Sequence, residues 1–119
     1  METDLFKELY DANPKSESLK NGLAISYEKL GDIHQDLGEV DKALEFFELR
    51  TKLAKELYEA NPKSVELKDG LAISFYKIGT IYTSENNSES KGYFDKAVGL
   101  WKELYDHTKI RKGCNFHFT

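Results

Sequence analysis

The stretch NPKSESLKNGLAIS, residues 13–26, returns 48 residues later as NPKSVELKDGLAIS, residues 61–74. At the same offset, residues 5–36 align with residues 53–84 and share 20 identities at 32 positions. This agreement is far above chance, so the chain contains an internal repeat. A repeat of this length is typical of an array in which each unit buries its apolar face against the next unit.

Each copy carries the apolar period of an α-helix. The periodic residues are Leu19, Leu23, Tyr27, Leu30, His34 and Leu37 in the first copy, and Leu67, Leu71, Phe75, Ile78 and Tyr82 in the second. Ser16 and Ser64 are the expected N-caps of these helices. Gly38 predicts the end of the first helix, after which Asp41 is expected to cap another. The expected helices cover residues 3–12, 16–37, 41–60, 64–84 and 92–107, and no stretch predicts a strand.

Length, charge and composition narrow the class of protein. A chain of 119 residues with a formal net charge of −4 is a single domain that favours neither nucleic acid nor an anionic membrane surface. No apolar run approaches the roughly 18 residues of a membrane span. The N-terminal METDLFKELYD lacks the features of a signal peptide, and Cys114 alone cannot form an internal disulfide. We therefore expect a cytoplasmic protein without nucleic-acid or membrane partners.

The spacing of aromatic and small residues resembles the tetratricopeptide repeat, a helix–turn–helix unit of about 34 residues. That family favours an aromatic residue, then Leu-Gly, then a second aromatic residue. The matching residues are Tyr27, Leu30, Gly31 and His34, and then Phe75, Ile78, Gly79 and Tyr82. The family's second helix carries a small residue, an aromatic residue and another small residue. Ala43 and Phe47 match while Arg50 departs, and in the second unit Ala97 and Trp101 match while Leu104 departs.

The resemblance implies an all-α, right-handed superhelix of antiparallel helix pairs, with about five helices. Because the period of 48 residues is longer than the family standard, the chain is similar to the long-helix variants. The expected organisation is a helical repeat domain at 1–108, made of a half-repeat at 1–12, a repeat at 13–60 and a modified repeat at 61–108, followed by a flexible tail at 109–119. In the modified repeat, SENNSESKG is expected to form a mobile loop before a shortened helix.

The same resemblance implies a non-catalytic protein–protein interaction module, a scaffold that holds a peptide or helix in a concave groove. The corresponding groove residues are Glu28, Asp32, Gln35, Asp36, Tyr76, Thr80 and Thr83. Glu28, Asp32 and Asp36 are spaced at i, i+4 and i+8 and would form an acidic strip that favours a basic partner. Tyr76 would add an aromatic surface. A solvated polar face is the alternative interpretation of the same residues.

The sequence predicts no enzyme, no cofactor and no metal site. His34 occupies a core position, so a packed imidazole is expected there. Cys114 and His117 have C-x-x-H spacing, but a structural zinc site needs four ligands and no second pair is nearby. Gly22 and Gly70 lie inside helices, and their repetition predicts close helix packing and not contact with a ligand.

The alternative function is structural, as a self-associating fragment of a longer repeat array. An array needs about three repeats and polar ends to be stable alone, and this sequence holds about two and a half. Apolar residues recur at both ends: Leu5, Phe6 and Leu9 at one, and Leu100, Trp101 and Leu104 at the other. If these residues are uncovered, they favour a homo-oligomer formed through the end helices.

Overall fold

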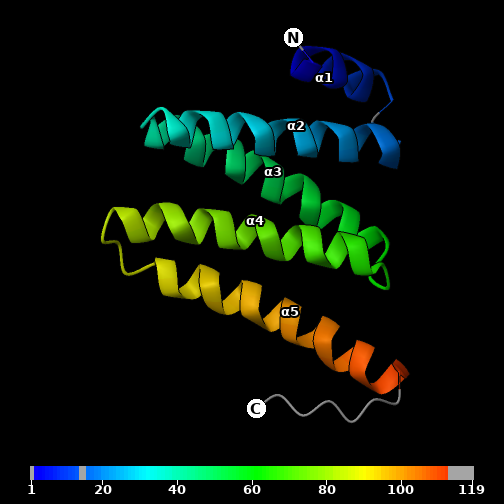
Figure 1. Ribbon diagram of the computed structural model, residues 1–119. Helices are drawn as coiled ribbons and strands as arrows, with labels where there is room; N and C mark the ends of the chain where they lie inside the picture. The colour runs from blue at the N-terminus through cyan, green and yellow to red at the C-terminus, as the bar shows by residue number, and fades with distance from the viewer. Residues whose placement is uncertain (1, 14–15, 113–119) are drawn as a thin grey trace.

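The computed structural model describes residues 2–13 and 16–112, and over these ranges it contains α-helices and no strands (Figure 1). The helices are α1 (Glu2–Ala12), α2 (Glu17–Asp36), α3 (Val40–Ala60), α4 (Val65–Ser84) and α5 (Ser90–Lys112). The expected all-α class is therefore confirmed for the described part of the chain. Four of the expected helices agree closely in position, whereas α5 begins earlier and ends later than expected.

The repeated serines begin α2 and α4 in the same way. The Ser16 hydroxyl accepts a hydrogen bond from the Leu19 N–H at 3.2 Å, and the Ser64 hydroxyl accepts one from the Leu67 N–H at the same distance. Each bond satisfies an N–H group that has no partner within its own helix. The repeated sequence therefore sets the beginning of both helices, as predicted.

The turn between α2 and α3 follows the prediction only in part. Gly38 has a φ of +79°, the left-handed conformation that glycine adopts without a steric penalty. Asp41 is not a cap, because α3 begins one residue earlier at Val40 and Glu39 occupies the N-cap position without a side-chain bond. Leu37 lies at the end of α2 and is exposed, so its predicted place on the apolar face is also wrong.

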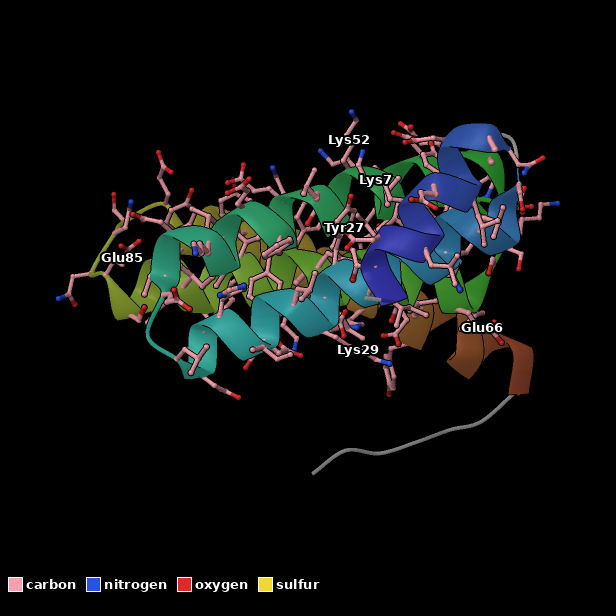
Figure 2. All side chains as sticks on the ribbon, turned by 90° about the horizontal axis from the view of Figure 1, so that it is seen from above. Lys7, Tyr27, Lys29, Lys52, Glu66 and Glu85 are labelled. Carbon is pink, nitrogen blue, oxygen red and sulfur yellow. The ribbon has the colours of Figure 1, made fainter. Side chains whose placement is uncertain are left out.

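The helices follow one another in chain order across a thin layer. The extensive contacts join α1 to α2, α2 to α3, α3 to α4 and α4 to α5. The Cα atoms extend over 47 × 38 × 18 Å. Figure 2 shows Lys29 of α2 and Lys52 of α3 on opposite faces of the layer, with Tyr27 between them. The layer therefore has an α2–α4 face, marked by Lys29, and an opposite face marked by Lys52.

The core is divided into three clusters along this layer. The first contains Leu23, Ala24, Tyr27 and Leu53, the second Ala43, Phe47, Ile78 and Ile81, and the third Ala54, Leu71, Phe75 and Ala97. The second and third clusters both join α3 to α4. Apolar burial is thus shared between neighbouring helices and has no single centre, as the repeated sequence predicts.

Two glycines allow aromatic rings to lie directly against a helix backbone. A Cβ atom on Gly31 would lie 2.4 Å from Cε1 of Phe47, and one on Gly79 would lie 2.7 Å from Cε1 of Phe94. Neither distance is compatible with any residue larger than glycine unless the ring moves. The close helix packing expected at Gly70 is wrong, because a Cβ there would meet only an Arg50 nitrogen at 3.5 Å. The tight packing is found at Gly31 and Gly79 instead.

The glycine contacts also correct the alignment of α5 with α3. Because Gly31 and Gly79 are counterparts, Phe94 corresponds to Phe47, and the predicted match of Trp101 to Phe47 is wrong. The helices are then related by an offset of 47, so Ala97 corresponds to Arg50. The same offset aligns LAKELY at 53–58 with LWKELY at 100–105.

The corrected alignment changes the account of the modified repeat. With 23 residues, α5 is longer than α3, which has 21, so it is not shortened. The segment between α4 and α5 is only residues 85–89, with Asn86 at a φ of +55°. A match of Ala97 to Ala43 predicts a longer loop and a shorter helix, but the residue that corresponds to Ala43 is Ser90, at the start of α5.

The end residues are covered unequally. Leu5 and Leu9 of α1 are exposed, as expected, whereas the Phe6 side chain lies outside the described part. Leu100, Trp101 and Leu104 are half-buried, and the first two pack against the third core cluster. The C-terminal apolar residues are therefore largely used within the α4–α5 pair.

Candidate partner-binding face

The seven candidate groove residues lie on two helices, α2 and α4. Glu28, Asp32, Gln35 and Asp36 are on α2, and Tyr76, Thr80 and Thr83 are on α4. The Lys77 ammonium on α4 donates a hydrogen bond of 2.7 Å to Asp32 Oδ1 on α2. This ion pair brings the middle of the two candidate sets together on the α2–α4 face.

Glu28 forms an ion pair with Arg50, a buried cation at a position where the family pattern has a small residue. Arg50 interrupts the apolar face of α3, is only 8% exposed, and donates from Nε to Glu28 Oε1 at 3.3 Å. A buried guanidinium needs such a partner, because an uncompensated charge is costly away from water. In the second helix pair, Tyr76 stands in place of Glu28 and Ala97 in place of Arg50. Both partners of the ion pair are therefore replaced together.

Asp32 is held by a second cation with contacts of its own. Lys77 Nζ lies 5.8 Å from the centroid of the Phe47 ring as well as against Asp32. The Thr80 hydroxyl donates to the Lys77 carbonyl oxygen at 2.6 Å, so it is directed at its own helix. Because Glu28 and Asp32 are each paired to a cation, the electrostatic potential of the strip is less negative than the sequence predicted.

The remaining polar candidates lie toward the same end of the face. Asp36 is the last residue of α2 and is exposed, and Gln35 beside it is half-buried. Thr83 is exposed near the end of α4. Among the described acidic residues of the strip, Asp36 is the one whose carboxylate stands most open to solvent.

Tyr76 is the largest exposed group of the candidate set, and its ring is well supported. It is 45% exposed, and its ring centroid lies 5.6 Å from that of Phe94 and 5.9 Å from that of Trp101. Trp101 is fixed in turn, because its Nε1–H donates to Asp69 Oδ1 at 2.8 Å. We refer to Tyr76, Phe94 and Trp101 as the aromatic cluster. Tilted rings at these separations attract one another, so the Tyr76 ring is held in place.

Sequence reasoning missed three contributors to this face: Arg50, Phe94 and Trp101. The misplaced alignment of α5 concealed the two aromatic residues. A signal for Arg50 was present in the sequence, because Glu28 and Arg50 both change between the copies, to Tyr76 and Ala97. A charged pair that is lost together indicates a contact more strongly than either residue does alone.

His34 is packed as expected and forms one polar contact. Its ring is half-buried and stacks on Phe46 with centroids 5.3 Å apart. Its Nδ1 lies 3.0 Å from Glu39 Oε1. The hydrogen bond with His34 is the largest cause of a pKa of Glu39 below the usual value, with smaller contributions from nearby charge. The contact joins the last turn of α2 to Glu39, the residue that directly precedes α3.

A depression of about 410 Å³ lies between α3 and α5 over α4, away from the candidate residues. Its lining residues are Glu48, Thr51, Lys52, Lys55, Glu56, Glu59, Phe75, Ile78, Tyr93 and Lys96. Lys55 and Lys96 lie 5.6 and 5.3 Å from the centroid of the Phe75 ring. Because its lining contains three acidic and three basic residues, this depression has no dominant sign of charge that would select a ligand.

Among the side chains that the structure describes, no group of three or more His, Cys, Asp or Glu residues is placed to hold a metal ion. Cys114 and His117, with their metal-like spacing, lie outside the described residues. No helix in the described chain combines the length and apolar character needed to cross a membrane. Comparisons with family models, with curated proteins and with solved structures found no match to this chain.

Proposed function

We propose that this chain is a non-catalytic protein-interaction module that binds a peptide or a helix across its α2–α4 face. The observation that supports this best is the supported, half-exposed ring of Tyr76 beside the Asp32–Lys77 ion pair. Aromatic residues held rigidly are favourable contact points, because little side-chain freedom is lost when a partner covers them. A polar pair next to such a ring supplies the orientation that an apolar contact alone lacks.

The finer fold assignment is part of the same proposal: a right-handed superhelix of the tetratricopeptide type, in its long-helix form. The corrected alignment supports it, because Ser90, Phe94 and Ala97 now supply the small, aromatic and small residues of the family's second helix. In that family the first helices of successive pairs line the binding surface, and α2 and α4 are the first helices here.

The proposed partner segment carries an apolar or aromatic side chain for Tyr76 and a basic group for the acidic end of the face. Asp36 is open to solvent, and Glu28 is only half-buried within its pair with Arg50. A basic group near these carboxylates adds favourable charge without displacing Arg50. Lys29, which is exposed on the same face, disfavours a second basic group close to the first.

The test is selection of binding peptides from a random library displayed on phage, using the full chain as the target. Selected peptides are then titrated against the Tyr76→Ala and Asp36→Lys variants, with Leu49→Ala on α3 as a control for loss of an exposed apolar side chain. We expect Tyr76→Ala to weaken binding about tenfold or more and Leu49→Ala to leave it unchanged. Peptides that bind all of these variants with equal affinity would remove the α2–α4 face from consideration.

A further inference from the structure

The two ends of the helix layer expose residues whose counterparts in the middle are buried. At the α2 end, Ile33 is 53% exposed, whereas its counterpart Ile81 on α4 is 1% exposed. At the α5 end, Val98 is 57% exposed, whereas its counterpart Thr51 on α3 is 7% exposed. Each end of the helix layer therefore exposes one side of a helix–helix contact whose two sides meet in the middle of the layer.

The complete contact is the one between α3 and α4. Ile81 of α4 packs there with Ala43 and Phe47 of α3 in the second core cluster. Thr51 lies one turn after Phe47 and one turn before Ala54, which contacts α4 in the third core cluster. The face of α3 that contains Thr51 therefore docks on the face of α4 that contains Ile81.

Ile33 is left open because α1 covers only part of the corresponding face of α2. At the offset of 48, α1 corresponds to residues 50–60 of α3, so it has no counterpart of Ala43 or Phe47. Those two α3 residues share the buried cluster of Ile81 on α4. By contrast, α5 carries both parts, with Phe94 in place of Phe47 and LWKELY in place of the LFKELY of α1.

The contacts of two equivalent lysines, one on α2 and one on α4, show that these sequence correspondences extend to structure. Lys20 of α2 lies 5.9 Å from the Tyr10 ring centroid and 3.0 Å from Glu56 Oε1. Its counterpart Lys68 lies 5.8 Å from the Tyr58 ring centroid and 3.1 Å from Glu103 Oε1. The KELY sequence thus provides a glutamate for the lysine of the preceding helix and a tyrosine for the lysine of the following helix.

We propose that a second copy of this chain docks its α5 on α2 in place of α1, reproducing the contact that α3 makes with α4. In this arrangement Phe94 of one copy lies against Ile33 of the other, as Phe47 packs with Ile81. Val98 lies in the same contact near Leu30, because its counterpart Thr51 lines the same surface as Ile78, the counterpart of Leu30. The two ends joined are different. The contact is therefore heterologous, so copies add head to tail. The intramolecular docking of α1 competes with it, which raises the protein concentration needed for association.

The experiment uses two full-length variants, Ile33→Asp and Val98→Asp, together with the unchanged chain. Both positions are more than half exposed, so neither substitution removes core packing, and circular dichroism verifies the fold of each variant. Sedimentation velocity is measured from micromolar to millimolar concentration. We expect the unchanged chain to associate and each single variant to associate about tenfold or more weakly, because a charge would enter an apolar contact. Leu49→Asp, an exposed position on α3 away from both ends, should associate as the unchanged chain does.

The decisive sample is an equimolar mixture of the two variants. Ile33→Asp retains an intact α5 end, and Val98→Asp retains an intact α2 end, so the mixture should form a 1:1 dimer that does not grow further. Hydrogen exchange of residues 2–12 in the Val98→Asp chain should become faster in this dimer, because its α1 is displaced. A mixture that stays monomeric, or an unchanged chain that is monomeric up to millimolar concentration, would overturn the proposal. Unchanged exchange of α1 in the mixed dimer would overturn the replacement of α1.

Discussion

Gly31→Ala tests whether close packing of aromatic rings, and not only the helical period, sets the distance between paired helices. The added Cβ would lie 2.4, 2.6 and 2.9 Å from three carbon atoms of the Phe47 ring. That ring is fully buried and packs with Ile78 and Ile81, so it has no free space to enter. Overpacking of this kind costs about 1–3 kcal/mol, whereas alanine gains about 1 kcal/mol over glycine in a helix. The difference is a net loss of about 0–2 kcal/mol from the free energy of unfolding, where an unhindered position would gain stability.

The matched control is Gly70→Ala, because the added Cβ there meets only Arg50 Nη2 at an ordinary 3.5 Å. Here the helix gain should dominate and stabilise the protein by about 0.5–1 kcal/mol. Urea unfolding followed by circular dichroism should separate the two variants by roughly 1 M in midpoint. In a double-mutant cycle, Phe47→Leu should remove most of the penalty at Gly31. If Gly31→Ala is as stabilising as Gly70→Ala, the contact with Phe47 does not determine the helix spacing.

Further substitutions test the polar contacts. Arg50→Ala should destabilise the protein by about 2–3 kcal/mol. This is less than the loss expected when a fully buried ion pair is broken, because Glu28 keeps some solvent contact. A loss as small as that from replacing an exposed lysine with alanine would show that the ion pair is unimportant. Ser64→Ala should cost about 1 kcal/mol through loss of the α4 cap, and an unchanged urea midpoint would contradict that assignment. In the folded protein, the pKa of Glu39 lies below its usual value of 4.5. The ionised Glu39 therefore stabilises the fold above pH 4.5, and this stabilisation is lost as the pH falls through the lower folded pKa. An NMR titration should show this lowered pKa, and His34→Gln should bring it closer to 4.5; no change would assign the shift to another group.

The helices and their caps were predictable because they depend on local chemistry. Ser16, Ser64 and Gly38 act within a few residues of their own position, so their roles follow from the printed order of residues. The cap at Asp41 failed because one extra residue joined α3 at its start. Such shifts of a single residue depend on small differences in free energy that sequence patterns do not resolve.

The alignment of α5 and the chemistry of the candidate face were harder to predict. Phe94 and Trp101 could be placed only after Gly79 showed which ring packs against it. Likewise, a list of carboxylates on α2 could not show that Asp32 is already paired with a lysine 45 residues further along the chain. Contacts between distant residues are set by the packing of whole helices, and local periodicity carries little information about them.

The order in which the helices contact one another also determines how this protein should fold. Since the extensive contacts join helices adjacent in the chain, folding requires the closure of short loops only, which favours rapid formation of the native state. The α2–α3 and α4–α5 pairs are the natural early units, and the α3–α4 contact then joins them. The same arrangement makes stability uneven, because α1 is the shortest described helix and its extensive contacts are with α2. It should open far more often than the whole chain unfolds, as a separate local transition at the N-terminal end.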